Sequence, residues 1–163
     1  MLSPDYASIE TPAGFSMNSS FYMPLDDGTQ VFYDVWLPEN LQFGEKIPTI
    51  VLTSRYTRHV KPSSLYKVLM TYLGEPDLNY DQARRYLERG YAYVFIQSPG
   101  SAGFTGIRGV EYPPTKIEAM GKIVDWITAQ EWSNGKIGST GRSYSATTAD
   151  MIAAANRSEI KAV

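Results

Sequence analysis

Hydrophobic residues along the chain follow two alternating patterns, which predict strands and helices in turn. Two continuous apolar runs, Ile47–Thr53 and Tyr91–Gln97, are typical of strands that are covered on both faces, as in a parallel α/β sheet. Apolar residues at helical spacing predict amphipathic helices between and after these runs. The helices expected on this basis are Ser64–Leu73, Asn79–Arg89 and a third that opens with a capping box of Thr115 and Glu118.

Two further strands, Ser19–Met23 and Thr29–Leu37, are predicted before the first buried run. The Asp27-Gly28 pair between them is a strong hairpin signal. Every second residue of the later strand, from Val31 on, is a valine, tyrosine or leucine, which is the period of a half-buried sheet. An antiparallel start followed by alternating buried strands and amphipathic helices favours an α/β fold with a mostly parallel sheet and helices on both faces.

One short stretch near the end of the chain carries candidate chemistry. Residues Gly141–Ser145 lie between a predicted strand, Lys136–Thr140, and an alanine-rich helix, and they match the nucleophile-elbow pattern Gly-x-Ser-x-Gly with its last glycine replaced by serine. In such a turn Ser143 is exposed, and the helix N-terminus points amide groups at it that can hold an oxyanion. The alternative is that Ser143 or Ser139 merely caps the helix, since serine is a preferred N-cap residue.

The composition of the chain indicates one soluble domain and disfavours several kinds of partner and binding site. The 163 residues fit one domain, with 43% hydrophobic and 20% charged residues, and residues 1–18 lack periodicity, so we expect a flexible N-terminal arm there. A net charge of −2 disfavours nucleic acid and anionic membranes as partners. Without cysteine, and with one histidine, we expect no metal and no cofactor. The absence of a signal-peptide pattern and of a long apolar segment leads us to expect a soluble protein, with the cytoplasm favoured.

Several segments together resemble, in the same order, the cocaine esterase, α-amino acid ester hydrolase and Xaa-Pro dipeptidyl-peptidase group of α/β-hydrolases. Similar segments are the opening hairpin, the third strand with the tyrosine after it, and the helix, strand and glycine loop Tyr86–Gly106. The most specific match is Asp125–Ala146, where two tryptophans, a glutamine, a Ser-Asn-Gly turn and Gly-x-Ser-Tyr stand in register. The resemblance implies that residues 19–163 are the N-terminal part of an α/β-hydrolase domain, truncated after the elbow helix.

The resemblance also implies roles for three residues. Ser143 would be the nucleophile that is acylated by a small acyl ester or peptide substrate, with the help of a histidine base. Tyr56 would give its hydroxyl to the oxyanion hole, and Tyr144 its backbone N–H. The alternative for Tyr56 is a tyrosine at a strand end, with a buried ring and a solvated hydroxyl.

The chain also departs from the family pattern. The loop after the fourth strand reads Gln97–Gly100 where the family usually has Asp-x-Arg-Gly, which leaves the polar anchoring of that loop open. In this fold the acid and the histidine follow the serine in chain order, yet none of the twenty residues after Ser143 is a histidine. The single histidine, His59, lies upstream and is expected to be a solvated loop residue.

Three charged residues, Asp150, Asp125 and Arg142, are further candidates for the site. Asp150 lies seven residues beyond Ser143 on the predicted elbow helix and should point away from the turn. Asp125 is expected to be a surface or capping charge. Arg142 could contact a substrate carboxylate, although an exposed arginine needs no such purpose.

Three functions therefore remain open. The first is the N-terminal part of a serine hydrolase that cleaves acyl esters or Xaa-Pro-type peptide bonds through an acyl-enzyme on Ser143, inactive alone because the histidine and the acid are absent. The second is a degenerate, non-catalytic α/β-hydrolase remnant or binding domain. An acyltransferase on the same scaffold is a third possibility. Part of a parallel sheet would also expose an edge, through which copies of the chain could pair.

Overall fold

The computed structural model describes residues 15–24, 28, 30–55, 80–98 and 114–163. The predicted helix Ser64–Leu73 lies outside the described residues. The strands are β1 (Phe15–Pro24), β2 (Gln30–Pro38), β3 (Ile47–Ser54), β4 (Ala92–Gln97), β5 (Ser133–Ser139) and β6 (Ile160–Ala162). The helices are α2 (Tyr80–Leu87), α3 (Pro114–Thr128) and α4 (Tyr144–Ala154).

The strands form one mixed sheet in the order β1-β2-β4-β3-β5-β6. β2 pairs in antiparallel fashion with β1 and with β4. β3 pairs in parallel fashion with both β4 and β5, and β5 pairs in parallel with β6. The predicted α/β fold, with an antiparallel start and a mostly parallel sheet, is therefore confirmed.

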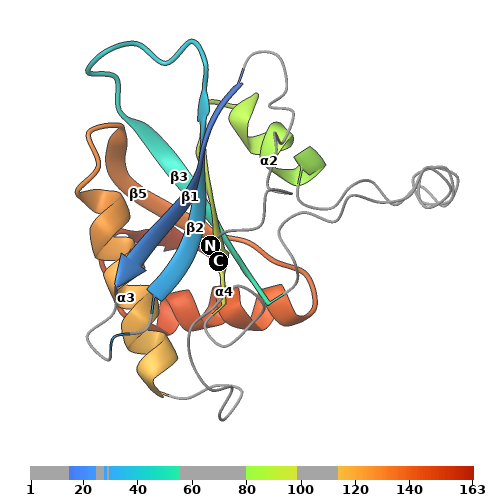
Figure 1. Ribbon diagram of the computed structural model, residues 1–163, viewed down its shortest axis with the longest axis vertical. Helices are drawn as coiled ribbons and strands as arrows, with labels where there is room; N and C mark the ends of the chain where they lie inside the picture. Colours follow the sequence, from blue (N-terminus) through green and yellow to red (C-terminus); the bar gives the residue numbers. More distant parts are fainter. Residues whose placement is uncertain (1–14, 25–27, 29, 56–79, 99–113) are drawn as a thin grey trace, which may run out of the picture.

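Helices cover both faces of this sheet (Figure 1). On one face α3 and α4 pack against the larger hydrophobic cluster, which contains Met120, Ile123, Val124 and Ile127 of α3. On the other face α2 contributes Ala83 and Leu87 to a smaller cluster. Burying such apolar side chains stabilises the fold by roughly 25 cal/mol for each Å² removed from water, which makes these two layers the main source of cohesion.

The burial of β2 differs from the sequence prediction. We expected a half-buried strand, but both faces are covered: Val31, Tyr33 and Val35 belong to the larger cluster, and Trp36 to the smaller one. The prediction was wrong because β2 lies inside the sheet, between β1 and β4, where helices cover both faces. Two-residue alternation in the sequence shows which residues share a face but does not show whether the second face is also covered.

Two element boundaries also differ from expectation. β1 begins at Phe15, so the last residues of the segment 1–18 that we expected as an arm pair with β2, with a register shift between Asn18 and Phe21. α3 begins at Pro114, so Thr115 lies inside the helix and not at the predicted capping position. Proline is common as the first helical residue because the missing N–H has no intrahelical acceptor there and the fixed φ suits the helix.

Candidate active site

The turn between β5 and α4 holds Ser143 in an unusual backbone conformation. Its φ is 59° and its ψ is −123°, and the residue is exposed. A residue other than glycine pays about 1–3 kcal/mol for such a sparsely populated conformation, which persists only where the surroundings over-determine it. Strand, strained serine and helix follow one another as the elbow pattern predicts.

Neither Ser143 nor Ser139 caps the N-terminus of α4 with its side chain. Ser143 occupies the N-cap position, but its side chain makes no capping hydrogen bond. Its carbonyl oxygen accepts the N–H groups of Ala146 at 3.0 Å and Thr147 at 3.4 Å. The Ser139 hydroxyl is buried and donates to the carbonyl of Ala149 at 3.2 Å, so it joins β5 to the middle of α4.

The two flanking positions of the elbow differ in how strictly they limit size. A Cβ atom on Gly141 would overlap the carbonyl group of Ser145 and lie 2.5 Å from the amide nitrogen of Ala146, so only glycine fits there. Ser145, which replaces the second glycine of the pattern, is buried in the first turn of α4. The turn therefore accommodates serine at its far side, and the strict size limit applies to Gly141.

Tyr144 brings the ends of two other strands to the elbow. Its side chain is buried, and its hydroxyl forms a 3.1 Å hydrogen bond with Oγ of Ser98, the residue after β4. The guanidinium carbon of Arg55, the residue after β3, lies 4.3 Å from the centre of the Tyr144 ring. Ser98 in turn donates its N–H to the carbonyl of Ser54 at 2.8 Å. In the described part of the Gln97–Gly100 loop, Ser98 therefore provides the polar anchoring that the sequence left open.

Thr148 fastens α4 to β3 and was not recognised from the sequence. Its hydroxyl lies 2.8 Å from the carbonyl oxygen of Thr53 and 3.0 Å from that of Ser145. A threonine inside a helix commonly bonds a carbonyl of the preceding turn, which was the one local signal available. The contact to Thr53 spans 95 residues of sequence and leaves no local signal.

Tyr86, on α2, reaches the residue before the elbow from the face of the sheet that α2 covers. The Tyr86 hydroxyl donates to Oγ1 of Thr140, the residue before Gly141, at 3.3 Å. The Tyr86 ring stacks on Tyr93, with the ring centres 5.9 Å apart. Burial raises the pKa of Tyr93 above its ordinary value, with a smaller contribution from Tyr86. Among the described residues the Tyr93 hydroxyl has no hydrogen-bond partner.

Of the remaining candidate residues, Arg142 lies in the turn next to Ser143, and Asp150 lies on α4. Tyr56 and His59 are outside the described residues. Asp150 and Arg142 are exposed. Within the described ranges no group of His, Cys, Asp or Glu is arranged to hold a metal ion. In the same part of the chain, no helix is long and apolar enough to cross a membrane.

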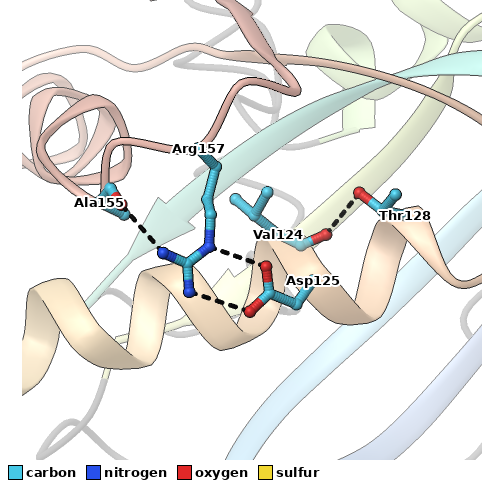
Figure 2. A network of polar contacts seen from close by, with 5 residues as sticks. All are labelled: Val124, Asp125, Thr128, Ala155 and Arg157. Carbon is cyan, nitrogen blue, oxygen red and sulfur yellow. Dashed lines mark hydrogen bonds and ion pairs between the residues drawn. The ribbon is translucent and has the colours of Figure 1, made fainter.

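Asp125 is a surface charge, as expected, and its partner is Arg157 (Figure 2). The guanidinium group donates from Nε to Oδ1 at 2.8 Å and from Nη2 to Oδ2 at 3.0 Å. This hydrogen bonding lowers the pKa of the Asp125 carboxyl group. The pair joins the turn after α4 to α3 and takes no part in the elbow.

Comparison with known proteins gives matches over most of the chain. The family model for X-Pro dipeptidyl-peptidases, the S15 family, matches residues 27–163. A predicted serine esterase of Mycobacterium bovis is 33% identical over 139 residues, which cover 82% of this chain and 22% of that protein. An Xaa-Pro dipeptidyl-peptidase of Lactobacillus helveticus is 32% identical over 92 residues, 47% of this chain and 12% of that one. The chain therefore spans less than a quarter of the length of these relatives.

A solved structure shares the fold. A CocE/NonD family hydrolase from Staphylococcus aureus superposes with a TM-score of 0.66 over 94% of this chain and 30% of its own. Its sequence is 23% identical, so this likeness concerns the fold alone.

Proposed function

Because the chain belongs to the X-Pro dipeptidyl-peptidase (S15) family, we propose that Ser143 is the nucleophile of a serine hydrolase that acts on acyl esters or peptides. The Ser143 oxygen attacks the substrate carbonyl, the alcohol or amine leaves with a proton, and water then hydrolyses the acyl-serine. The observation that carries the proposal is the backbone of Ser143, strained at φ 59° and ψ −123°, with an exposed side chain that does not cap the helix. Such a conformation presents a hydroxyl to an incoming substrate.

Two donors are proposed for the oxyanion that forms in this reaction. Tyr144 is the first residue of α4, and a backbone N–H at a helix N-terminus is placed to donate to an anion. Tyr56 follows Arg55, whose guanidinium group lies on the Tyr144 ring, and the family resemblance assigns its hydroxyl to the same oxyanion. Removing one such donor from a hydrolase typically costs about 2.7–4 kcal/mol in the transition state.

The proton acceptor and the acid are proposed to lie in sequence beyond these 163 residues. In α/β-hydrolases both follow the nucleophile in chain order, and none of the residues after Ser143 is a histidine. We therefore expect this sequence by itself to turn over no substrate, and we assign the hydrolysis to the natural protein that contains it.

A fluorophosphonate probe, which reacts with activated serines, tests the proposal. The natural protein should be labelled at Ser143, and Ser143→Ala should abolish labelling. Ser158→Ala, which changes an exposed serine after α4, is the matched control and should leave labelling unchanged. Labelling that persists in Ser143→Ala, or a natural protein that is not labelled at all, would contradict the proposal.

A non-catalytic domain of the same fold is the second candidate. It is favoured by the loop after β4, which reads Gln97–Gly100 where the family usually has Asp-x-Arg-Gly. Reading the gene past Val163 separates the two candidates: an in-frame continuation with an aspartate and a histidine supports the hydrolase. A stop codon, together with the matching mass of the natural protein, supports the non-catalytic domain.

A further inference from the structure

The side chain of Tyr144, next to the proposed nucleophile, is held at two points by residues from other strands. Its hydroxyl is hydrogen-bonded to Ser98, which is 1% exposed. The Arg55 guanidinium carbon lies 4.3 Å from the ring centre, a distance at which a cation is attracted by the ring face. The first residue of α4 is therefore fixed to the sheet as well as to its own helix.

The two residues that hold Tyr144 follow the ends of two paired strands. Ser54 and Gln97 are opposite one another in the parallel pairing of β3 and β4, and Arg55 and Ser98 are the residues that follow them. The N–H of Ser98 donates to the Ser54 carbonyl at 2.8 Å, which extends the ladder beyond the last strand residues. The backbone of Ser98 is therefore held to the sheet, and Arg55 directly follows the last paired residue of β3.

Holding the Tyr144 side chain has a direct effect on Ser143. The two residues share one peptide group, so rotation about ψ of Ser143 would swing the Tyr144 amide and displace its side chain. A strained residue keeps its conformation only where its surroundings resist such relaxation. We propose that Arg55 and Ser98 are positioning residues that, by holding the ring and hydroxyl of Tyr144, keep the Ser143–Tyr144 peptide in the geometry needed for acyl transfer. This inference rests on the proposed nucleophilic role of Ser143.

The test compares reaction rates in the natural protein that contains this sequence. Tyr144→Phe and Ser98→Ala each remove one of the two hydroxyl groups that form the hydrogen bond between these residues. Each should slow fluorophosphonate labelling and the kcat of p-nitrophenyl acetate hydrolysis by about 3- to 10-fold, with KM unchanged, as the loss of one hydrogen bond that orients the reacting groups would do. The double variant should be no slower than the slower single variant, because both changes break the same contact.

Arg55 is tested through its charge. Arg55→Met should slow labelling by about 2- to 5-fold, and Arg55→Lys, which keeps a cation over the ring, should restore part of the rate. Two matched controls separate positioning from general loss of stability. Ser133→Ala changes a buried serine at the opposite end of β5, and Arg84→Met changes an exposed arginine on α2. Both should label at the rate of the unmodified protein.

The outcomes distinguish this inference from the proposed function. If Ser143→Ala abolishes labelling but Tyr144→Phe, Ser98→Ala and Arg55→Met keep the full rate, the positioning role is overturned and the nucleophile stands. If the unmodified protein is not labelled, both fall together. Should Ser98→Ala fail to fold, Tyr144→Phe removes the same hydrogen bond and gives the answer alone.

Discussion

At the scale of single residues, the strain at Ser143 is maintained by contacts on both sides of the turn. Before it, the N–H of Thr140 donates to the Val51 carbonyl at 3.0 Å, which continues the pairing of β5 with β3. After it, the Ser143 carbonyl accepts two helical N–H groups. The pattern of small residues around a serine located, in the sequence, the turn that contains Gly141 and the strained residue Ser143. The partners of Tyr144 could not be found this way, because Ser98 lies 46 residues away and nothing local marks it.

A methyl group at Gly141 tests how tightly this turn is packed. Gly141→Ala should lower the free energy of unfolding by about 1–3 kcal/mol or more, because the added Cβ overlaps main-chain atoms that cannot move aside. It should also slow fluorophosphonate labelling. Gly121→Ala is the control: its Cβ would lie 3.1 Å from the end of the flexible Arg157 side chain and 3.8 Å from the Ala155 Cβ, an ordinary contact, and alanine favours the α3 helix. Urea unfolding measures both, and equal stability of the two variants would contradict the close approach at Gly141.

At the scale of elements, the sequence patterns predict where strands and helices lie better than they predict where these elements end and which of their faces are buried. The Ser-Asn-Gly segment is predicted as a turn before a strand that starts at Lys136, but β5 already begins at Ser133. The segment still has turn chemistry, since Asn134 Oδ1 accepts the N–H of Lys136 at 3.0 Å and Gly135 has a φ of 74°. The end of α4 was less visible. Asn156 stops that helix with a φ of 51°, where glycine is the usual residue. The second buried face of β2 was missed because burial depends on which helices cover the sheet.

The contact between the turn after α4 and α3 should be visible in the pH dependence of stability. Hydrogen bonding to Arg157 lowers the pKa of Asp125 in the folded protein below its ordinary 3.8. Because the folded pKa is lowered, the ionised carboxyl group stabilises the folded protein at pH values above the unfolded pKa. This stabilisation is lost as the pH falls through the folded pKa. Asp125→Asn should therefore be less stable than the unmodified protein at pH 7, and the difference should shrink below pH 3.8.

Chemical unfolding at several pH values measures this contribution. Arg157→Gln is the matched variant, and it should show the same convergence because it removes the same pair. High salt should reduce the difference at pH 7, since both side chains are solvent-accessible. A difference that stays constant from pH 7 to pH 3 would contradict the role of the ion pair.

At the scale of the whole molecule, strand order explains where the elbow lies. The parallel strands β4, β3 and β5 are adjacent, and their carboxyl ends meet beside Ser143, Arg55 and Ser98. Sites in open α/β sheets lie at this edge. The family resemblance seen in the sequence is confirmed by the family match over residues 27–163. The roles proposed for Ser143, Tyr56 and Tyr144 stay predictions.

His59, the single histidine of the sequence, allows one substitution to test whether the catalytic base follows the nucleophile in the chain. If the catalytic base follows Ser143 in the sequence, as in other α/β-hydrolases, then His59 is dispensable. His59→Gln in the natural protein should hydrolyse p-nitrophenyl acetate with unchanged kcat/KM, whereas removing a true base typically lowers the rate by about 10²–10⁴-fold. Ser143→Ala is the reference for complete loss. A folded His59→Gln protein that is as inactive as Ser143→Ala would make His59 the base, and the acid and base would then no longer be expected after the elbow.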